Sequence, residues 1–141
     1  MDLLALMFLA HLVGDYLLQN DTIAAKKVRP SFNPMYETLE EDDKYTNSQS
    51  VMWCALHCLL YTLSVAFFSL FSTAGLIPIY LLVFCFVTHF LIDHFRLARK
   101  YMDLVGQKKF ATGFCAPWSV FIVDNTFHIL TSWLIIVIMM V

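Results

Sequence analysis

The interiors of the apolar segments carry eight His and Asp side chains but no Lys, Arg or Glu. An ionisable group at the centre of a membrane helix costs at least ~2.5–3.5 kcal/mol, so it usually faces a bundle interior or a wet cavity and marks a functional site. Three pairs are spaced four residues apart, which places both members on one helix face: His11 and Asp15, His89 and Asp93, and Asp124 and His128. Imidazole and carboxylate groups that converge from several helices are typical of metal sites in helical bundles.

Seven of these side chains form the predicted set of metal ligands, namely His11, Asp15, His57, His89, Asp93, Asp124 and His128. A catalytic zinc ion takes about three protein ligands and a water, so this set suits one or two divalent ions. Imidazole and carboxylate bind zinc, manganese, iron or nickel, and zinc is the first candidate. We expect Asp15, Asp93 and Asp124 to be the catalytic carboxylates, one of which could also act as a general base. The eighth residue, His94, points about 100° away from Asp93 on its helix, so we interpret it as a packing or interfacial residue.

Three further side chains are predicted to support these ligands. Gln19 continues the face of His11 and Asp15 by one turn, and Trp53 precedes His57 by four residues. Arg96 follows Asp93 by three residues and could meet an anionic substrate at the mouth of the site. Each also has a structural interpretation, because Gln19 could cap a turn, Trp53 could anchor the interface and Arg96 could flank the membrane.

The composition is that of an integral membrane protein. Of the 141 residues, 60% are hydrophobic and 14% are charged, whereas soluble domains are about 45–50% apolar and about 25% charged. The net charge of -2 offers no basic surface for nucleic acid. The four cysteines lie in or beside apolar segments and no CxxC occurs, so we expect packed thiols and neither disulfides nor a thiolate zinc site.

Four predicted membrane helices, at about 2–20, 51–72, 76–99 and 117–141, position the His and Asp residues. Each is close to the ~20 residues that a bilayer core requires. A further segment at about 101–113 mixes apolar and charged residues and is predicted to lie at the interface. The first segment lacks the basic start and cleavage site of a signal peptide, so we expect it to be a helix. The fold class predicted for residues 1–141 is a single all-α domain, an integral membrane four-helix bundle.

The basic residues predict the orientation of this bundle. All nine Lys and Arg lie either between the first two helices or from the end of the third helix to the start of the fourth. By the positive-inside rule, loops one and three are cytoplasmic and both termini are outside, in a multi-pass protein of the inner (cytoplasmic) membrane. At 1.5 Å rise per residue, the seven ligands then share one layer about 5–17 Å below the cytoplasmic surface.

The segment His11-Leu-Val-Gly-Asp15-Tyr-Leu-Leu-Gln19-Asn-Asp21, with Ala25-Lys26-Lys27, resembles the opening of a family of small bacterial and phage membrane proteins, the domain of unknown function 3307 family. That family continues with Trp-x-x-x-His and then His-x-x-x-Asp, which Trp53/His57 and His89/Asp93 match, and Asp124/His128 fits a later position. More distantly, the pattern is similar to that of YdjM-type membrane-bound metal-dependent hydrolases and of the helical zinc phospholipase C group. This resemblance implies cleavage of phosphoesters by analogy, although the chain is smaller and has fewer candidate ligands.

The leading hypothesis is a membrane-embedded metal-dependent hydrolase of a phosphoester, either an inner-leaflet lipid or a cytoplasmic nucleotide. A mononuclear or dinuclear His/Asp centre would activate water and stabilise the charge of the transition state. One alternative is a metal-ion or proton transporter, although a pathway should distribute its groups across the bilayer. The other is a scaffold or regulator, although polar contacts between membrane helices contribute only ~0.6 kcal/mol each. The expected partners are the lipid bilayer and a phosphate-containing small molecule or lipid. The sequence also allows a homo-oligomer.

Overall fold

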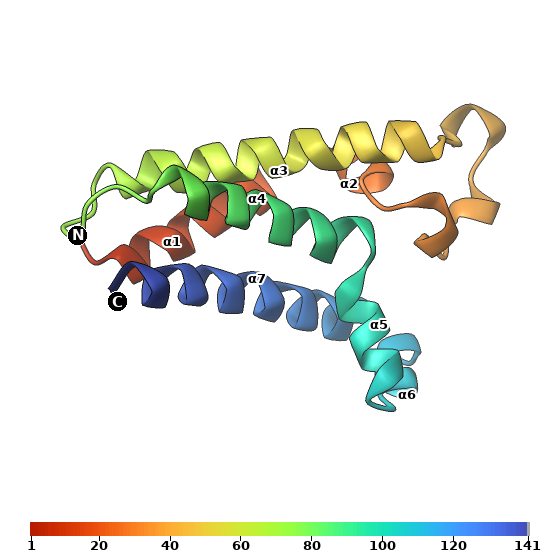
Figure 1. Ribbon diagram of the computed structural model, residues 1–141. Coiled ribbons are helices and arrows are strands. Elements are labelled where there is room, and N and C mark those ends of the chain that lie inside the picture. The colour runs from red at the N-terminus through yellow and green to blue at the C-terminus, as the bar shows by residue number, and fades with distance from the viewer. Residues whose placement is uncertain (141) are drawn as a thin grey trace.

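The computed structural model describes residues 1–140 apart from the side chain of Pro117, and all regular structure in this part of the chain is helical. Four helices lie side by side (Figure 1): α1 (Leu3–Leu12), α3 (Asn47–Ser69), α4 (Ile79–His94) and α7 (Ala116–Met140). Both chain ends and the turn from α3 to α4 lie together at one end of this set. The shorter helices lie toward the other end: α2 (Asp21–Lys26), α5 (Leu97–Leu104) and α6 (Lys108–Thr112).

Two helices of the described chain, Asn47–Ser69 and Trp118–Met140, are long and apolar enough to cross a membrane. A third candidate span is α4 together with α5, whose axes differ by 62°. The segment Leu3–Leu17 is apolar but shorter. At ~1.5 Å per residue it covers about 22 Å, which is less than the ~30 Å of a hydrocarbon core. The chain is therefore a membrane protein by length and apolar composition, with two or three candidate spans.

The first helix ends earlier than the predicted range of 2–20. It is α-helical over Leu3–Leu12, continues as a π-helical turn over Val13–Leu17, and is followed by the separate helix α2. A new helix begins after Asn20, because the Asn20 side chain accepts a hydrogen bond from the Ile23 backbone N–H at 2.9 Å and so caps the N-terminus of α2. Single π-helical turns occur frequently at functional sites, and this one carries Asp15.

The predicted helix at 76–99 is wrong as one continuous element. Helix α4 ends at His94 and α5 begins at Leu97. Between them Arg96 has φ 50° and ψ 52°, and it is the only non-glycine residue with a positive φ among the described residues. This left-handed conformation redirects the chain through the 62° bend. The predicted interfacial segment at 101–113 consequently consists of the end of α5, a turn at Gly106 and α6.

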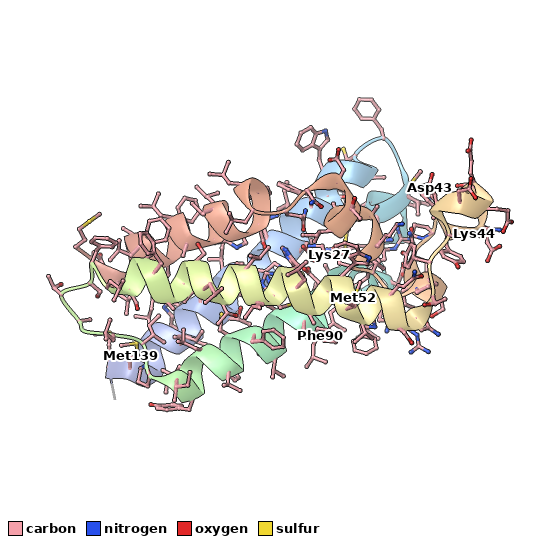
Figure 2. All side chains as sticks on the ribbon, turned by 90° about the horizontal axis from the view of Figure 1, so that it is seen from above. Lys27, Asp43, Lys44, Met52, Phe90 and Met139 are labelled. Atoms are coloured by element: carbon pink, nitrogen blue, oxygen red, sulfur yellow. The ribbon has the colours of Figure 1, made fainter. Side chains whose placement is uncertain are left out.

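The other two helices differ from the predicted ranges of 51–72 and 117–141 mainly at their ends. Helix α3 begins at Asn47 because Thr46 and Gln49 form a reciprocal capping box. Toward the chain termini, the helices are joined by an apolar core that includes Met7, Val65, Leu81 and Ile135. Figure 2 shows mostly carbon around Met139, whereas nitrogen and oxygen atoms gather from Lys27 toward Asp43 and Lys44. The molecule is therefore apolar at one end and polar at the other.

Candidate metal centre

Six of the seven predicted ligands lie in one buried cluster among the helices. Each has at most 8% of its surface exposed: His11, Asp15, His57, His89, Asp93 and His128. They come from α1 and its π-helical turn, α3, α4 and α7, so segments far apart in the sequence meet at this point. The seventh, Asp124, lies one turn before His128 and keeps 33% of its side chain exposed.

The imidazoles of His57 and His89 form the centre of the cluster, with their Nε2 atoms 3.0 Å apart. Asp15 Oδ1 lies 3.3 Å from the first and 3.2 Å from the second of these nitrogens. Asp93 Oδ2 lies 3.1 Å and 3.3 Å from the same two atoms. Nitrogen and oxygen ligands at 2.0–2.1 Å from a tetrahedral metal ion are about 3.3–3.4 Å from one another. The distances of Asp15 and of Asp93 from this pair of imidazoles are therefore those expected between ligands of one metal ion, and Asp15, His57 and His89 form one group that could hold an ion.

The other carboxylate oxygen of Asp93, Oδ1, faces a second set of candidate ligands. His128 Nε2 lies 3.3 Å from Asp93 Oδ1 and 3.5 Å from Asp124 Oδ2. The ligand atoms of His89, Asp93 and His128 also lie within 4.8 Å of one another, close enough to hold an ion. A carboxylate that presents one oxygen to each of two groups can bridge two metal ions. The arrangement thus offers places for one ion or two.

Two candidate ligand atoms, Asp15 Oδ1 and His128 Nε2, are buried without a hydrogen bond among the described residues. A buried polar atom without a partner costs about 1–3 kcal/mol, and each such atom requires an explanation. A metal ion would satisfy both atoms, since each faces the cluster. Nδ1 of His57 and Nδ1 of His128 also have no hydrogen bond in the described chain.

His11 is engaged through both of its ring nitrogens. Its Nε2 lies 2.8 Å from Asn125 Oδ1, and its Nδ1 lies 3.2 Å from Asp15 Oδ2 and 3.3 Å from the Tyr61 hydroxyl. The Tyr16 hydroxyl also donates to Asn125 Oδ1, and the Tyr61 ring stacks on His89 with centroids 3.9 Å apart. In this arrangement His11 contacts the outer oxygen of Asp15 and leaves Oδ1 facing the cluster, which suits an orienting role.

Lys27 brings a cation into the cluster from the chain that follows α2. Its ammonium donates to Asp93 Oδ2 at 2.7 Å and lies 3.2 Å from His57 Nε2. Its backbone is fastened to α4, because His94 Nδ1 donates to the Lys27 carbonyl at 3.2 Å and the Arg29 N–H donates to the His94 carbonyl at 3.1 Å. Burial disfavours the ammonium, but the carboxylate of Asp93, with that of Asp15, outweighs this cost and raises the pKa of Lys27.

The three predicted supporting residues have different surroundings. Arg96 is half-buried, lines a cavity with Asp93, and donates to the Phe32 carbonyl at 3.4 Å. Gln19 is half-buried, and its Oε1 has no hydrogen bond in the described chain. Trp53 is half-buried, and within the described residues its side chain makes no hydrogen bond to a predicted ligand. Of these three residues, only Arg96 therefore lines a cavity together with a predicted ligand, Asp93.

Sequence reasoning missed Lys27, Tyr61 and Asn125. Tyr61 could have been found, because it follows His57 by four residues and so shares its helix face. Asn125 precedes His128 by three residues, which is a weaker indication of the same kind. Lys27 has no such spacing to a predicted ligand, because it lies beyond the break between the first helix and α2.

No family model, no curated protein and no solved structure matches the chain. The resemblance to the domain of unknown function 3307 family and to YdjM-type hydrolases therefore stays a prediction.

Proposed function

We propose that the chain is a membrane-embedded metal-dependent hydrolase that cleaves a phosphoester. The observation that carries this proposal is the convergence of six buried His and Asp side chains from separate helices. Hydrogen bonding between helices does not account for them, because such contacts are worth only ~0.6 kcal/mol each in membranes. Ligand-atom separations of 3.0–3.3 Å, and two buried ligand atoms without a hydrogen bond in the described chain, support a metal ion at this place.

We also propose the membrane arrangement that this function requires. The helices α1, α3, α4 and α7 would form a four-helix bundle in the inner membrane, with loops one and three in the cytoplasm and both termini outside. The placement of all nine Lys and Arg in these loops and at their edges supports this orientation. The cluster would then be accessible from the cytoplasm or the inner leaflet, where phosphoesters are abundant as lipids and nucleotides.

Each ligand would have a distinct role. His57 and His89 would hold one divalent ion together with a carboxylate of Asp15 or Asp93, with zinc as the first candidate and manganese, iron or nickel as others. His128, Asp124 and the second oxygen of Asp93 would be available to a second ion. A bound ion would supply a Lewis acid that activates water and stabilises charge on the phosphoryl group. Asp124 is the most exposed carboxylate of the set, so its Oδ2 is suited to accept the proton of the attacking water.

Hydrolysis can be tested on purified protein incubated with each of the four metals. The substrates would be a chromogenic phosphomonoester, a chromogenic phosphodiester and phosphatidic acid in mixed micelles. We expect at least one to be cleaved, with the rate reduced by about 10²-fold or more in Asp124→Asn and unchanged in the control Asp42→Asn, whose side chain is exposed in loop one. The proposal is wrong if metal-loaded protein cleaves none of them, or if Asp124→Asn retains full activity.

A second candidate, proton or metal-ion transport, is favoured by one specific observation. Contacts of 3.5 Å or less run without interruption from Asp124 through His128, Asp93 and His57 to Asp15. Relays of this kind move protons in membrane proteins. Proteoliposomes separate the two functions, since transport predicts ion flux that depends on His128, whereas hydrolysis alone predicts none.

A further inference from the structure

A cavity of about 530 Å³ adjoins the cluster at the polar end of the molecule. Asp93 and Asp124 lie in its wall, together with segments from the end of α2, the bend between α4 and α5, α6 and the start of α7. This volume is within the ~300–1,000 Å³ that is usual for small-molecule sites. The cavity is therefore large enough for a substrate whose reacting group contacts the candidate ligands.

Three cationic side chains line this cavity: Lys27, Arg96 and Arg99. Two of them already have an acidic partner, because Lys27 donates to Asp93 at 2.7 Å and Arg99 donates to Asp103 at 3.3 Å. Arg96 forms no ion pair with any described residue, and its one side-chain hydrogen bond there is the long contact to the Phe32 carbonyl. A half-buried guanidinium without a carboxylate is therefore available to an anion.

The backbone at Arg96 gives a second reason to assign a role to this residue. Its left-handed conformation, with φ 50°, is costly for a residue with a Cβ atom and is usually left to glycine or asparagine. Strained backbone of this kind persists where the surrounding structure enforces it, and it clusters at ligand sites. The conformation places the arginine at the 62° bend, on the wall that Asp93 also lines.

We infer that this cavity binds the phosphate group of the substrate, with Arg96 as its principal anchor. The inference rests on the proposed function and names the substrate class of the same site. A planar guanidinium binds phosphate through two parallel hydrogen bonds. Divalent ions on Asp93 and Asp124 would neutralise the carboxylates in the wall and leave the cavity positive. Apolar side chains complete it and suit the non-polar part of a phosphate ester: Val28, Pro34, Met35, Val120 and Phe121.

The test compares Arg96→Asn with the matched control Arg29→Asn. Asparagine tolerates the left-handed conformation, so the first variant removes the guanidinium with little backbone strain. Arg29 lies beside the same bend, because its backbone N–H donates to the His94 carbonyl, and it packs over Phe32 but does not line the cavity. The probes are inorganic phosphate, adenosine 5′-monophosphate and dihexanoyl phosphatidic acid, with adenosine and dihexanoylglycerol as their uncharged counterparts. Binding is measured by calorimetry on detergent-purified protein, with and without added metal, and metal content is measured in parallel.

We expect at least one phosphate probe to bind more tightly than its uncharged counterpart. Arg96→Asn should weaken that binding about tenfold or more, as expected for loss of a charged hydrogen-bonding partner, and Arg29→Asn should change it less than about twofold. A preference for phosphatidic acid would identify a lipid source, and a preference for the nucleotide a soluble one. If Arg96→Asn does not fold, Arg99→Gln against Arg29→Gln gives the same comparison, with a smaller expected loss.

Several results would overturn the inference. These are the absence of binding by every phosphate probe, equally tight binding of the uncharged counterparts, and equal losses in the two asparagine variants. Metal content separates this failure from that of the proposed function. Protein that binds metal but none of the phosphate probes would refute phosphate binding in the cavity and would leave the proposal of a metal centre standing. Protein without metal would refute the centre, while Arg96-dependent phosphate binding would still support the cavity.

Discussion

Asp93 is the residue on which the cluster depends most. Its Oδ2 contacts His57, His89 and Lys27, and its Oδ1 contacts His128. Among the described candidate ligands, Asp93 is the only carboxylate with an oxygen within 3.5 Å of a nitrogen of His57, of His89 and of His128. The ammonium of Lys27 is the feature that sets a limit on metal binding, because it lies 2.7 Å from an oxygen that a metal ion would also use.

Replacing Lys27 by Met should therefore increase the affinity for divalent metal. Removal of a unit charge this close to a ligand oxygen should tighten binding by about tenfold or more. Competition with a fluorescent chelator would measure the change, and Lys26→Met is the matched control because Lys26 does not contact the cluster. Unchanged or weaker metal binding in Lys27→Met would show that the ammonium assists the site and does not compete with the ion.

At the scale of elements, the cluster depends on two interruptions of helical structure. Asp15 belongs to the π-helical turn at Val13–Leu17, and its carboxylate lies beside the imidazoles of His57 and His89. Arg96 lies at the bend between α4 and α5 and lines the cavity. The turn can approach α3 because Gly14 has no side chain. A Cβ atom at that position would lie 2.7 Å from Tyr61 Cδ2 and 3.1 Å from Tyr61 Cα.

Gly14→Ala should destabilise the protein and disturb the cluster together. The buried Tyr61 ring stacks on His89, so it cannot move aside without cost, and overpacking of this kind costs about 1–3 kcal/mol. Thermal unfolding in detergent would measure the loss. Leu17→Ala is the control, since Leu17 lies in the same turn with 77% of its surface exposed. A Gly14→Ala protein as stable as the wild type would contradict this close approach.

Arg96→Gly should separate stability from ligand binding. Glycine adopts the left-handed conformation freely, so relief of backbone strain should stabilise the fold by about 1 kcal/mol, while loss of the guanidinium should abolish Arg96-dependent phosphate binding. Chemical unfolding would measure the first effect. The control Arg29→Gly should show no gain, because Arg29 has φ -57° and no such strain. A destabilised Arg96→Gly protein would mean that the arginine serves the fold.

At the scale of the whole molecule, the sequence predicts best what depends on helix faces. Ionisable side chains on apolar helices avoid lipid and face the interior between the helices. This rule predicts the meeting of His57, His89, Asp93 and His128. The sequence predicts least what depends on single capping and backbone events. Neither the π-helical turn at Val13–Leu17 nor the left-handed Arg96 changes the hydrophobic pattern, which therefore predicts unbroken helices at 2–20 and 76–99.

The same limit explains the contacts that bring Lys27 into the cluster. They join a loop to α4 through His94, and their long separation along the chain leaves no periodic signal in the sequence. Among the described helices, the shortness of the apolar Leu3–Leu17 segment likewise depends on where the helix ends and not on its composition. The sequence thus predicts the ligands on the helix faces but neither the contact of Lys27 with them nor the bend at Arg96.

The central claim is that the His/Asp cluster holds metal, and elemental analysis by mass spectrometry tests it most directly. Detergent-purified wild type, Asp93→Asn and the control Asp103→Asn would be incubated with zinc, manganese, iron or nickel and freed of excess. We predict about one or two equivalents of one metal in the wild type and the control, and almost none in Asp93→Asn. A wild-type protein that retains none of the four metals, or an Asp93→Asn protein that retains them fully, would contradict the claim.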